Sequence, residues 1–315
     1  MQSAEPTLNS FSNPVAKYLA ATRPAFLSVT LVACLIGLAT AHFSGLPLQL
    51  DKALVTIFFA LVAHAGVNVI NDYYDALNGS DAANQERVFP FTGGSRFIQN
   101  GLLSLRGAAW FGYALLAAVI PAGLWLMQVS SAELFWVGLA GLGVGWAYSA
   151  PPFKLMSRGL GELAIVAGWL LVVVGTDLVQ RGSVALLPWL AGLPYALLVA
   201  NILYINQFPD LKADACAGKR TLVVRLGPGE ARWGYLGVAT LAYGLILFMV
   251  GRSLLPIYAA AGAFALPFSF HAARQLLAHA CHPALLVPAI KLSILAANLG
   301  GLLLAAGLFF ATPSP

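Results

Sequence analysis

Residues 52–75 read KALVTIFFALVAHAGVNVINDYYD, an apolar run of membrane length that ends in an acidic cluster. A second long apolar run ends similarly, in Asn206-Gln207-Phe208-Pro209-Asp210, and Asp214 follows four residues later. Each run passes through Ile-Asn and reaches an aspartate four residues after that asparagine. Carboxylates beside membrane-length apolar runs are costly unless they hold cations. The repeated pattern therefore predicts two related helical units that bring their ends to one functional site.

The composition places the whole chain in a membrane. Of its 315 residues, 59% are hydrophobic and only 9% are charged, whereas a soluble domain carries roughly 25% charged residues. The apolar stretches lack the period-two alternation of barrel strands. We therefore predict an all-α, multi-pass bundle, a single domain over residues 1–315 with a polar N-terminal segment at 1–15. Nine spans are predicted, near residues 26–45, 52–72, 105–128, 132–150, 160–178, 184–206, 231–250, 254–276 and 287–311.

The positions of lysine and arginine predict the orientation of the bundle. With nine spans, the N-terminus and the loops after the even-numbered spans lie on one side. Every Lys and Arg except Lys52, Arg181 and Arg252 falls on that side, and such an excess marks the cytoplasmic face. We expect the N-terminus and both acidic clusters to be cytoplasmic, in a bacterial inner membrane. The pI near 9.2 follows from these loops, so no nucleic-acid partner is indicated, nor does any pattern indicate an obligatory protein partner.

The acidic side chains suit a hard divalent cation. On a helix, residues four apart lie on one face, so Asp210 and Asp214 can share an ion. Asn71 and Asp75 have the same spacing, with Asp72 between them. Mg²⁺ takes oxygen ligands and usually bridges one or two carboxylates to substrate phosphates. Two such sites facing each other predict a diphosphate held through Mg²⁺, in an anion site completed by basic residues of the flanking loops, among them Arg96, Lys154, Lys219 and Arg220.

A diphosphate bound beneath the cytoplasmic face of an apolar bundle implies a lipidic tail that runs into the membrane. The ligand predicted in this way is a polyprenyl diphosphate. Mg²⁺ and basic side chains would neutralise the departing pyrophosphate. Aromatic faces, such as those of Tyr74 and Tyr148, would shield the resulting allylic cation from water, and an electron-rich acceptor could then attack it.

These residues resemble the UbiA superfamily of intramembrane aromatic prenyltransferases, which is marked by two Asp-rich motifs on a nine-helix bundle with Mg²⁺ and prenyl diphosphate between them. Asp81 follows the first motif two positions later than the general pattern. This spacing is similar to the dihydroxynaphthoate prenyltransferase branch, which serves menaquinone biosynthesis. Three further stretches of the sequence resemble the same branch: Gly94-Ser95-Arg96-Phe97-Ile98-Gln99, Arg158-Gly159-Leu160-Gly161-Glu162 and Ala217-Gly218-Lys219-Arg220-Thr221.

The resemblance implies a role for each candidate residue. Lys154 matches the family lysine that reaches the diphosphate, and Arg23 lies where the branch places Arg-Pro before the first span. The expected Mg²⁺ ligands are Asn71, Asp72, Asp75, Asp81, Asp210 and Asp214. The expected substrate-binding residues are Arg23, Asn68, Asn71, Tyr74, Arg96, Tyr148, Asn206, Lys219 and Arg220. The expected catalytic residues are Asp72, Asp75, Lys154, Asp210 and Asp214.

The second cluster departs from the branch, which commonly has Asn-Asn-x-Arg-Asp where this chain has Pro209 before Asp210. Because proline removes a helix hydrogen bond, we expect a kink or a helix end there. This departure affects the prediction of the acceptor's identity more than that of the diphosphate chemistry. The favoured acceptor is 1,4-dihydroxy-2-naphthoate, ahead of 4-hydroxybenzoate or another aromatic acid.

A cation-coupled membrane transporter is the alternative from another class, since Asn and Asp at helix ends can also coordinate a transported cation. Clusters at span ends, among basic residues, favour an anionic ligand instead. Asn68 either contacts substrate or joins helices through its amide. A lone His in a span, such as His64, is more often a structural hydrogen-bonding residue than a base.

Overall fold

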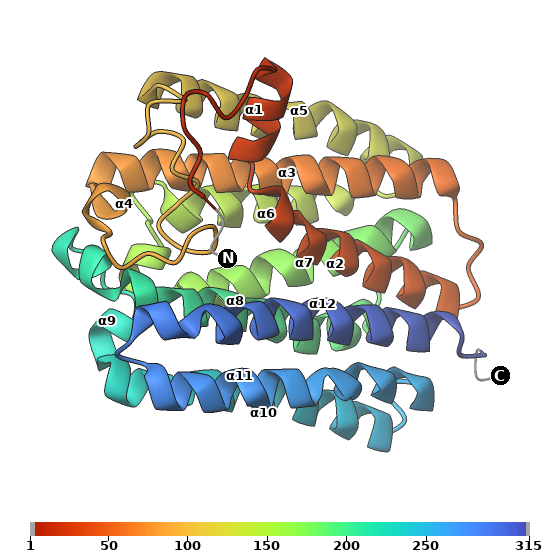
Figure 1. Cartoon of the computed structure of the whole chain (residues 1–315). Helices are drawn as coiled ribbons and strands as arrows, with labels where there is room; N and C mark the ends of the chain where they lie inside the picture. The colour runs from red at the N-terminus through yellow and green to blue at the C-terminus, as the bar shows by residue number, and fades with distance from the viewer. Residues whose placement is uncertain (1–3, 313–315) are drawn as a thin grey trace.

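The structure is a computed structural model that describes residues 4–312, and within that range it contains helices and no strand. Residues 1–3 of the predicted polar N-terminal segment, and residues 313–315, lie outside the described residues. The long helices run side by side in one bundle (Figure 1). The elements are α1 (Pro14–Ala21), α2 (Pro24–Phe43), α3 (Leu50–Asn78), α4 (Ser80–Ala83), α5 (Leu105–Val129), α6 (Leu134–Ser149), η1 (Met156–Arg158), α7 (Gly161–Arg181), α8 (Leu187–Cys216), α9 (Leu222–Leu226), α10 (Pro228–Gly251), η2 (Ile257–Ala265), α11 (Leu266–His279), η3 (Pro283–Leu286) and α12 (Val287–Phe309).

Among the described residues, seven helical segments are long and apolar enough to cross a membrane. They are α2, α3, α5, α7, α8, α10 and the joined η3–α12. The other two predicted spans coincide with α6, which has 16 residues, and with η2 followed by α11. The prediction of an all-helical integral membrane protein is therefore confirmed, whereas the count of nine spans remains a prediction.

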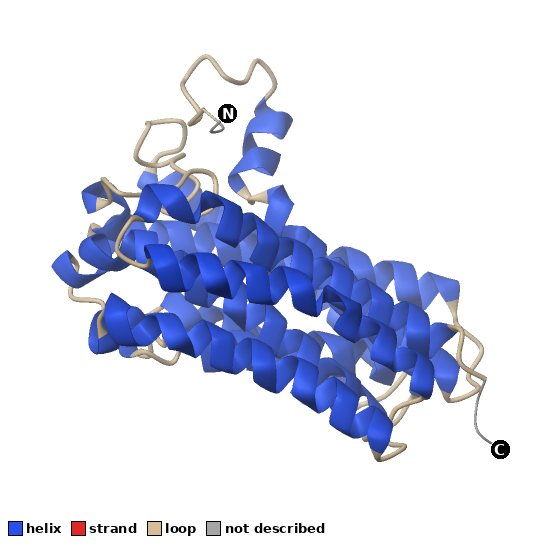
Figure 2. Ribbon diagram, turned by 60° about the horizontal axis from the view of Figure 1, so that its bottom comes forward, coloured by secondary structure: helices blue, strands red, loops and turns tan. Residues whose placement is uncertain are grey.

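The main core forms where α2, α7, α8, α10, η2 and α12 pack together. The helices lie side by side, with loops at both ends of the bundle (Figure 2). Tyr195 of α8 is buried in this core and donates its hydroxyl to the Val29 carbonyl of α2 at 2.5 Å. Gly37 lets α2 approach α7 closely, because a Cβ at this position would lie 2.4 Å from the Val173 carbonyl oxygen. Such close packing of small residues substitutes in lipid for a hydrophobic driving force between helices.

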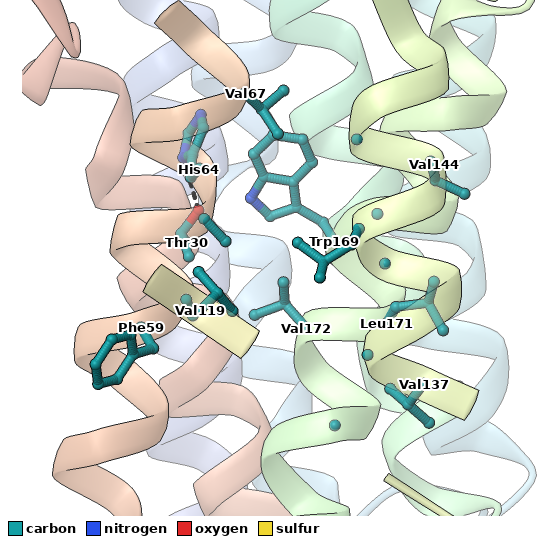
Figure 3. Close-up of a pocket in the computed structure, with 18 of the residues that line it drawn as sticks. Thr30, Phe59, His64, Val67, Val119, Val137, Val144, Trp169, Leu171 and Val172 are labelled. Atoms are coloured by element: carbon teal, nitrogen blue, oxygen red, sulfur yellow. Dashed lines mark hydrogen bonds between the residues drawn. The ribbon is translucent and has the colours of Figure 1, made fainter. Parts of the chain in front are cut away.

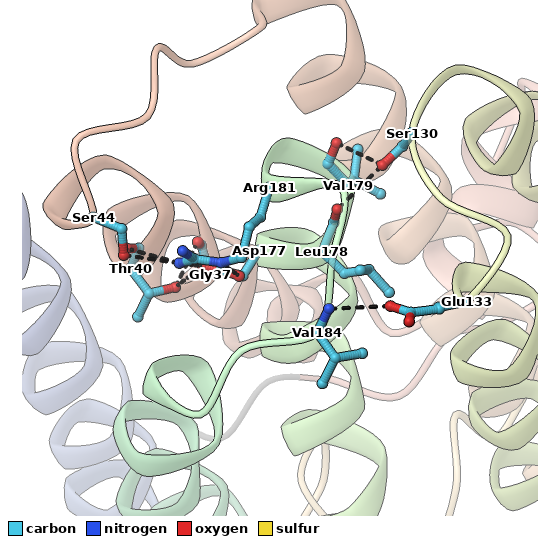
Figure 4. A network of polar contacts seen from close by, with 10 residues as sticks. All are labelled: Gly37, Thr40, Ser44, Ser130, Glu133, Asp177, Leu178, Val179, Arg181 and Val184. Atoms are coloured by element: carbon cyan, nitrogen blue, oxygen red, sulfur yellow. Dashed lines mark hydrogen bonds and ion pairs between the residues drawn. The ribbon is translucent and has the colours of Figure 1, made fainter.

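A polar network ties the bundle together at the end remote from the acidic clusters (Figure 4). Asp177 of α7 is buried and bonds to Arg181 one turn later, with Nε–Oδ2 and Nη2–Oδ1 distances of 2.6 and 2.8 Å. Thr40 of α2 donates to the same carboxylate at 2.8 Å, and Arg181 donates to the Ser44 hydroxyl at 2.9 Å. The buried Asp177 carboxylate therefore has both a positively charged partner and hydrogen-bond donors. Because these groups come from α2 and α7, the network joins the ends of the two helices.

Replacing Asp177 with asparagine should lower the free energy of unfolding by about 3 kcal/mol, because the Arg181 guanidinium loses its buried carboxylate partner. Thermal melting of the purified protein in detergent measures the effect. Asp51→Asn, at an exposed aspartate in the first turn of α3, is the matched control and should change stability by less than about 0.5 kcal/mol. Equal melting temperatures for the two variants would show that the network contributes nothing.

The long segment between α4 and α5 is a packed cap at the opposite end of the bundle. Its Phe97, Leu102 and Leu103 are buried against Ala21 of α1. The N-terminal segment fastens this cap through Glu5, whose carboxylate lies 2.6 Å from Arg87 Nε and 3.6 Å from Arg96 Nε. Burial opposes the ionisation of Glu5, but its bonds to Arg87 and Asn100 outweigh that cost and lower its pKa.

Candidate active site

The first acidic cluster lies in the last two turns of α3, a helix of 29 residues that ends at Gly79, where φ is +81°. Asp72 and Asp75 are three residues apart, so both point to one side of the helix, and both are buried. Asp72 is paired with Arg23 at 2.9 Å and accepts the backbone N–H of Ser95 at 3.1 Å. The cap and the start of α2 therefore hold this carboxylate in place.

The second cluster lies near the end of α8, a helix of 30 residues. The helix continues through Pro209 to Cys216, so the expectation that it could end at the proline is wrong. Asp210 accepts a hydrogen bond from Asn84 at 2.5 Å, and Asp214 is only 2% exposed. A bundle can bury the segment around a proline because neighbouring groups satisfy the freed backbone.

Lys219 joins the two clusters. Its ammonium nitrogen lies 2.7 Å from Asp75 Oδ1 and 3.3 Å from Asp214 Oδ1, and the residue is only 3% exposed. Burial alone would lower the pKa of Lys219, but the two carboxylates outweigh it and raise the pKa above its ordinary value. Carboxylates more than 130 positions apart in the sequence thus lie on either side of one nitrogen atom.

Asp81, in the short helix α4, is the third acidic element of the site. Gln99 donates to its Oδ2 at 3.4 Å, and burial together with Asp75 and Asp72 raises the pKa of Asp81 well above its ordinary value. Gly94 makes room for it: a Cβ there would lie 2.2 Å from Asp81 Oδ2, and the φ of +74° favours glycine. The cap loop is therefore shaped around this carboxylate.

The side chains of both clusters fit Mg²⁺. They offer carboxylate and amide oxygens, the donors that this ion prefers. Three buried oxygen atoms accept no hydrogen bond from the described residues: Asp214 Oδ2, Asn206 Oδ1 and the nearby Asn84 Oδ1. In the part of the chain that the structure describes, no group of three His, Cys, Asp or Glu side chains is arranged to hold an ion by itself. Protein Mg²⁺ sites commonly complete their coordination with phosphate oxygens and water.

An apolar cavity of about 560 Å³ extends from the clusters into the bundle, between α2, α3, α5, α6, α7 and α8 (Figure 3). Its polar end is lined by five of the predicted substrate-binding residues: Arg23, Asn68, Asn71, Tyr148 and Asn206. Asn71 donates to Asp75 and to Ser149, both at 3.1 Å. Asn68 donates to the Thr22 carbonyl at 2.9 Å and Asn206 to the Phe91 carbonyl at 3.4 Å, so these amides also join elements of the fold.

Ten of the predicted site residues are not among those that line the cavity. They are the five aspartates and Lys219, described above, and Tyr74, Arg96, Lys154 and Arg220. Lys154 and Arg220 are exposed, and the structure records no ion pair for either within residues 4–312. Tyr74 bonds to the Tyr113 hydroxyl at 2.8 Å, on the α5 side of α3. Arg96 is buried and donates to the Asp81 carbonyl at 2.6 Å. In this arrangement Lys219, rather than Lys154, is the lysine that contacts the acidic clusters.

Three site residues were missed by the sequence interpretation. Asn84 contacts Asp210 from the cap, Ser149 bonds to Asn71 from the end of α6, and Gln207 bonds to Glu162 of α7. Asn84 carried a usable signal, because it lies in the polar loop directly after Asp81. Ser149 ends α6 and Gln207 lies within α8, and only the packing of these helices against α3 and α7 gives the two side chains their partners.

Comparison with known proteins identifies a family. The UbiA prenyltransferase family profile matches residues 30–294. The chain is 30% identical to the 1,4-dihydroxy-2-naphthoate octaprenyltransferase of Mycobacterium tuberculosis over 63% of this chain and 66% of that protein, just under two thirds of its length. It is 31% identical to the protein of the same name from Haemophilus influenzae, over 70% and 73% of the two chains.

The fold also matches a solved structure, that of a UbiA homologue from Archaeoglobus fulgidus bound to GPP and Mg²⁺. The TM-score is 0.59 at 17% identity, over 91% of this chain and 99% of the other. The resemblance predicted from the sequence motifs is thereby confirmed, as is the expectation of a prenyltransferase at the level of the family. The chain belongs to the UbiA prenyltransferase family.

Proposed function

We propose that the protein transfers a polyprenyl group from its diphosphate to an aromatic acid, most specifically 1,4-dihydroxy-2-naphthoate. One observation carries this proposal: Asp75 of α3 and Asp214 of α8 meet at Lys219, and Asn71, which donates to Asp75, lines the polar end of an apolar cavity. An anion could bind between acidic helices only with cations between them, and a lipidic tail needs an apolar space that begins there. The relatives named as dihydroxynaphthoate octaprenyltransferases support the choice of acceptor.

The residues that would hold Mg²⁺ are Asn71, Asp72, Asp75, Asp81, Asp210 and Asp214. When bound, Mg²⁺ would screen the diphosphate from these carboxylates and stabilise the negative charge that develops on it. Arg23 and Lys219 are close enough to the carboxylates to turn toward the diphosphate, and Tyr148 would face the prenyl carbon from the cavity wall. Lys154 and Arg220, on the exposed rim, would attract the diphosphate from solution.

The reaction exchanges one bond for another. The bond between the prenyl C1 and the diphosphate oxygen breaks, and its electron pair leaves with the diphosphate. A ring carbon of the acceptor supplies the electron pair for the new bond to C1. The ring then becomes aromatic again by losing a proton or, if the attacked carbon carries the carboxylate, CO₂. The buried walls of the cavity would exclude water, which would otherwise capture the allylic cation.

We infer nine membrane spans, because α6 and the η2–α11 segment pack alongside the seven long helices in the same bundle (Figure 1). The chain then forms a single domain whose N-terminus and active site face the cytoplasm, in a bacterial inner membrane. The excess of Lys and Arg on the side of the clusters supports this orientation.

The direct test is an assay of the purified protein in detergent with labelled polyprenyl diphosphate, Mg²⁺ and each acceptor in turn. We expect transfer to 1,4-dihydroxy-2-naphthoate, with slower transfer to 4-hydroxybenzoate. A folded preparation that transfers the label to no aromatic acid would refute the proposed function.

Thermal melting separates the enzyme from a cation transporter. Mg²⁺ with a polyprenyl diphosphate should raise the melting temperature well above that with Mg²⁺ alone, since both ligands would bind only the folded site. A ligand present at 100 times its Kd stabilises by about 2.7 kcal/mol. A transporter would instead respond to the cation alone, with no further gain from the diphosphate.

A further inference from the structure

A small polar group lies in the apolar part of the cavity, below the acidic clusters (Figure 3). It consists of Thr30 of α2, His64 of α3 and Trp169 of α7, which all line the cavity. Thr30 Oγ1 is 2.8 Å from His64 Nδ1, and the imidazole meets the Trp169 ring edge to face, with 5.0 Å between ring centroids. The imidazole is therefore held in position by contacts from two neighbouring helices.

The hydrogen bonds of this group are incomplete, unlike those of the other hydroxyl groups deeper in the cavity. Thr56 and Thr176 donate to carbonyls of their own helices, both at 2.7 Å. In contrast, the Trp169 indole nitrogen is buried and has no hydrogen-bond partner in the part of the chain that the structure describes. Within residues 4–312 the one hydrogen bond recorded for His64 uses Nδ1, which leaves Nε2 for a ligand in the cavity.

An apolar ligand alone would be a poor occupant of this position. A polar group that is taken out of water without a hydrogen bond costs about 1–3 kcal/mol, and a prenyl tail offers none. A ring hydroxyl would both accept from and donate to nitrogen atoms there, and its anion would accept from them. His64 precedes Asn71 by seven residues, about 10 Å along the helix axis, so an aromatic ring fits between them.

We propose that His64 binds a ring hydroxyl of the aromatic acceptor, with Thr30 and Trp169 as positioning residues that orient the imidazole. The inference rests on the proposed function and deepens it by naming a determinant of acceptor specificity. The contact with His64 makes the site selective for an acceptor with two ring hydroxyls. A monohydroxy acid can lack the hydroxyl that His64 binds. Sites built to bond a substrate hydroxyl reject analogues without it.

The test compares His64→Phe, which keeps a flat ring without nitrogen, with the wild type on three acceptors. These are 1,4-dihydroxy-2-naphthoate and its two monohydroxy analogues, which lack either the 1- or the 4-hydroxyl. For the dihydroxy acid, the KM should rise about 10-fold, the loss expected for one buried hydrogen bond, with the KM for the prenyl diphosphate unchanged. The analogue that lacks the contacted hydroxyl should be used equally well by both proteins. His64→Gln, which retains a donor and an acceptor, should recover part of the loss.

Matched controls are His42→Phe, at a histidine that stacks on Phe309 outside the cavity, and Trp110→Phe, at an exposed tryptophan. Both should behave as the wild type, whereas Trp169→Phe should raise the acceptor KM. If His64→Phe affects all three acceptors equally, or raises the KM for the prenyl diphosphate instead, the inference is wrong. Its failure is distinct from failure of the proposed function, in which the wild type would transfer to no acceptor. Should His64→Phe not fold, the same comparison with Trp169→Phe decides.

Discussion

Asp75→Asn should lower kcat about 1,000-fold, the scale seen when one group that stabilises developing charge is removed. The substitution keeps the shape of the side chain but removes a negative charge and a strong metal ligand from the α3 cluster. It also takes away the nearer of the two carboxylates that hold Lys219, at 2.7 Å. The loss should appear in kcat at saturating substrate, since the charge on the diphosphate develops as the bond breaks. Initial rates of prenyl transfer at saturating Mg²⁺ measure it.

Asp51→Asn provides the control within the same helix, because Asp51 is an exposed aspartate at the far end of α3. It should retain the wild-type rate. If Asp75→Asn kept more than about a tenth of wild-type kcat, Asp75 would not be part of the reacting site, and the effect would fall within that of one ordinary hydrogen bond.

Lys219→Met should lower the free energy of unfolding of the ligand-free protein by about 3 kcal/mol. Without the ammonium, Asp75 and Asp214 would face each other across a buried site with no cation between them. Mg²⁺ with polyprenyl diphosphate would supply cations at the same place. The melting temperature of the variant should therefore rise more on adding this pair of ligands than that of the wild type does.

Lys212→Met is the matched control, because Lys212 is an exposed lysine of α8 that pairs with Glu86 on the surface. Exposed pairs contribute at most about 1 kcal/mol, so this variant should melt near the wild type and gain no more from the ligands. A Lys219→Met protein that melts like Lys212→Met would show that the bridging contact is not structural. Equal ligand-induced shifts in Lys219→Met and the wild type would show that metal does not replace the ammonium.

The sequence predicted the broad fold because lipid imposes simple rules on it. Apolar runs of spanning length must be helical there, since every backbone group needs an internal partner. It also predicted that the clusters around Asp75 and Asp214 would meet, because both end spans on the same side of the membrane. Segment lengths were harder to predict: α6 is only 16 residues long, and the eighth predicted span is divided between η2 and α11.

The contacts within the site depended on loops, for which the sequence gives no such rule. Lys154 and Lys219 both lie in basic loops beside the clusters, and nothing in their spacing tells which one turns inward. The short turn after α8 carries Lys219 back onto Asp214, as its N–H bonds to the Asp214 carbonyl at 2.9 Å. Arg96 was expected at the substrate, but the cap directs it to Asp81 and to Glu5, a residue over 90 positions away.

The most direct measurement is an experimental structure of the protein with Mg²⁺ and a non-reacting polyprenyl diphosphate analogue. We predict metal density in contact with carboxylates from both α3 and α8, with the diphosphate between them and the tail in the cavity that contains His64. A diphosphate bound elsewhere, with Asp75 and Asp214 still paired to Lys219 and no metal beside them, would contradict the account.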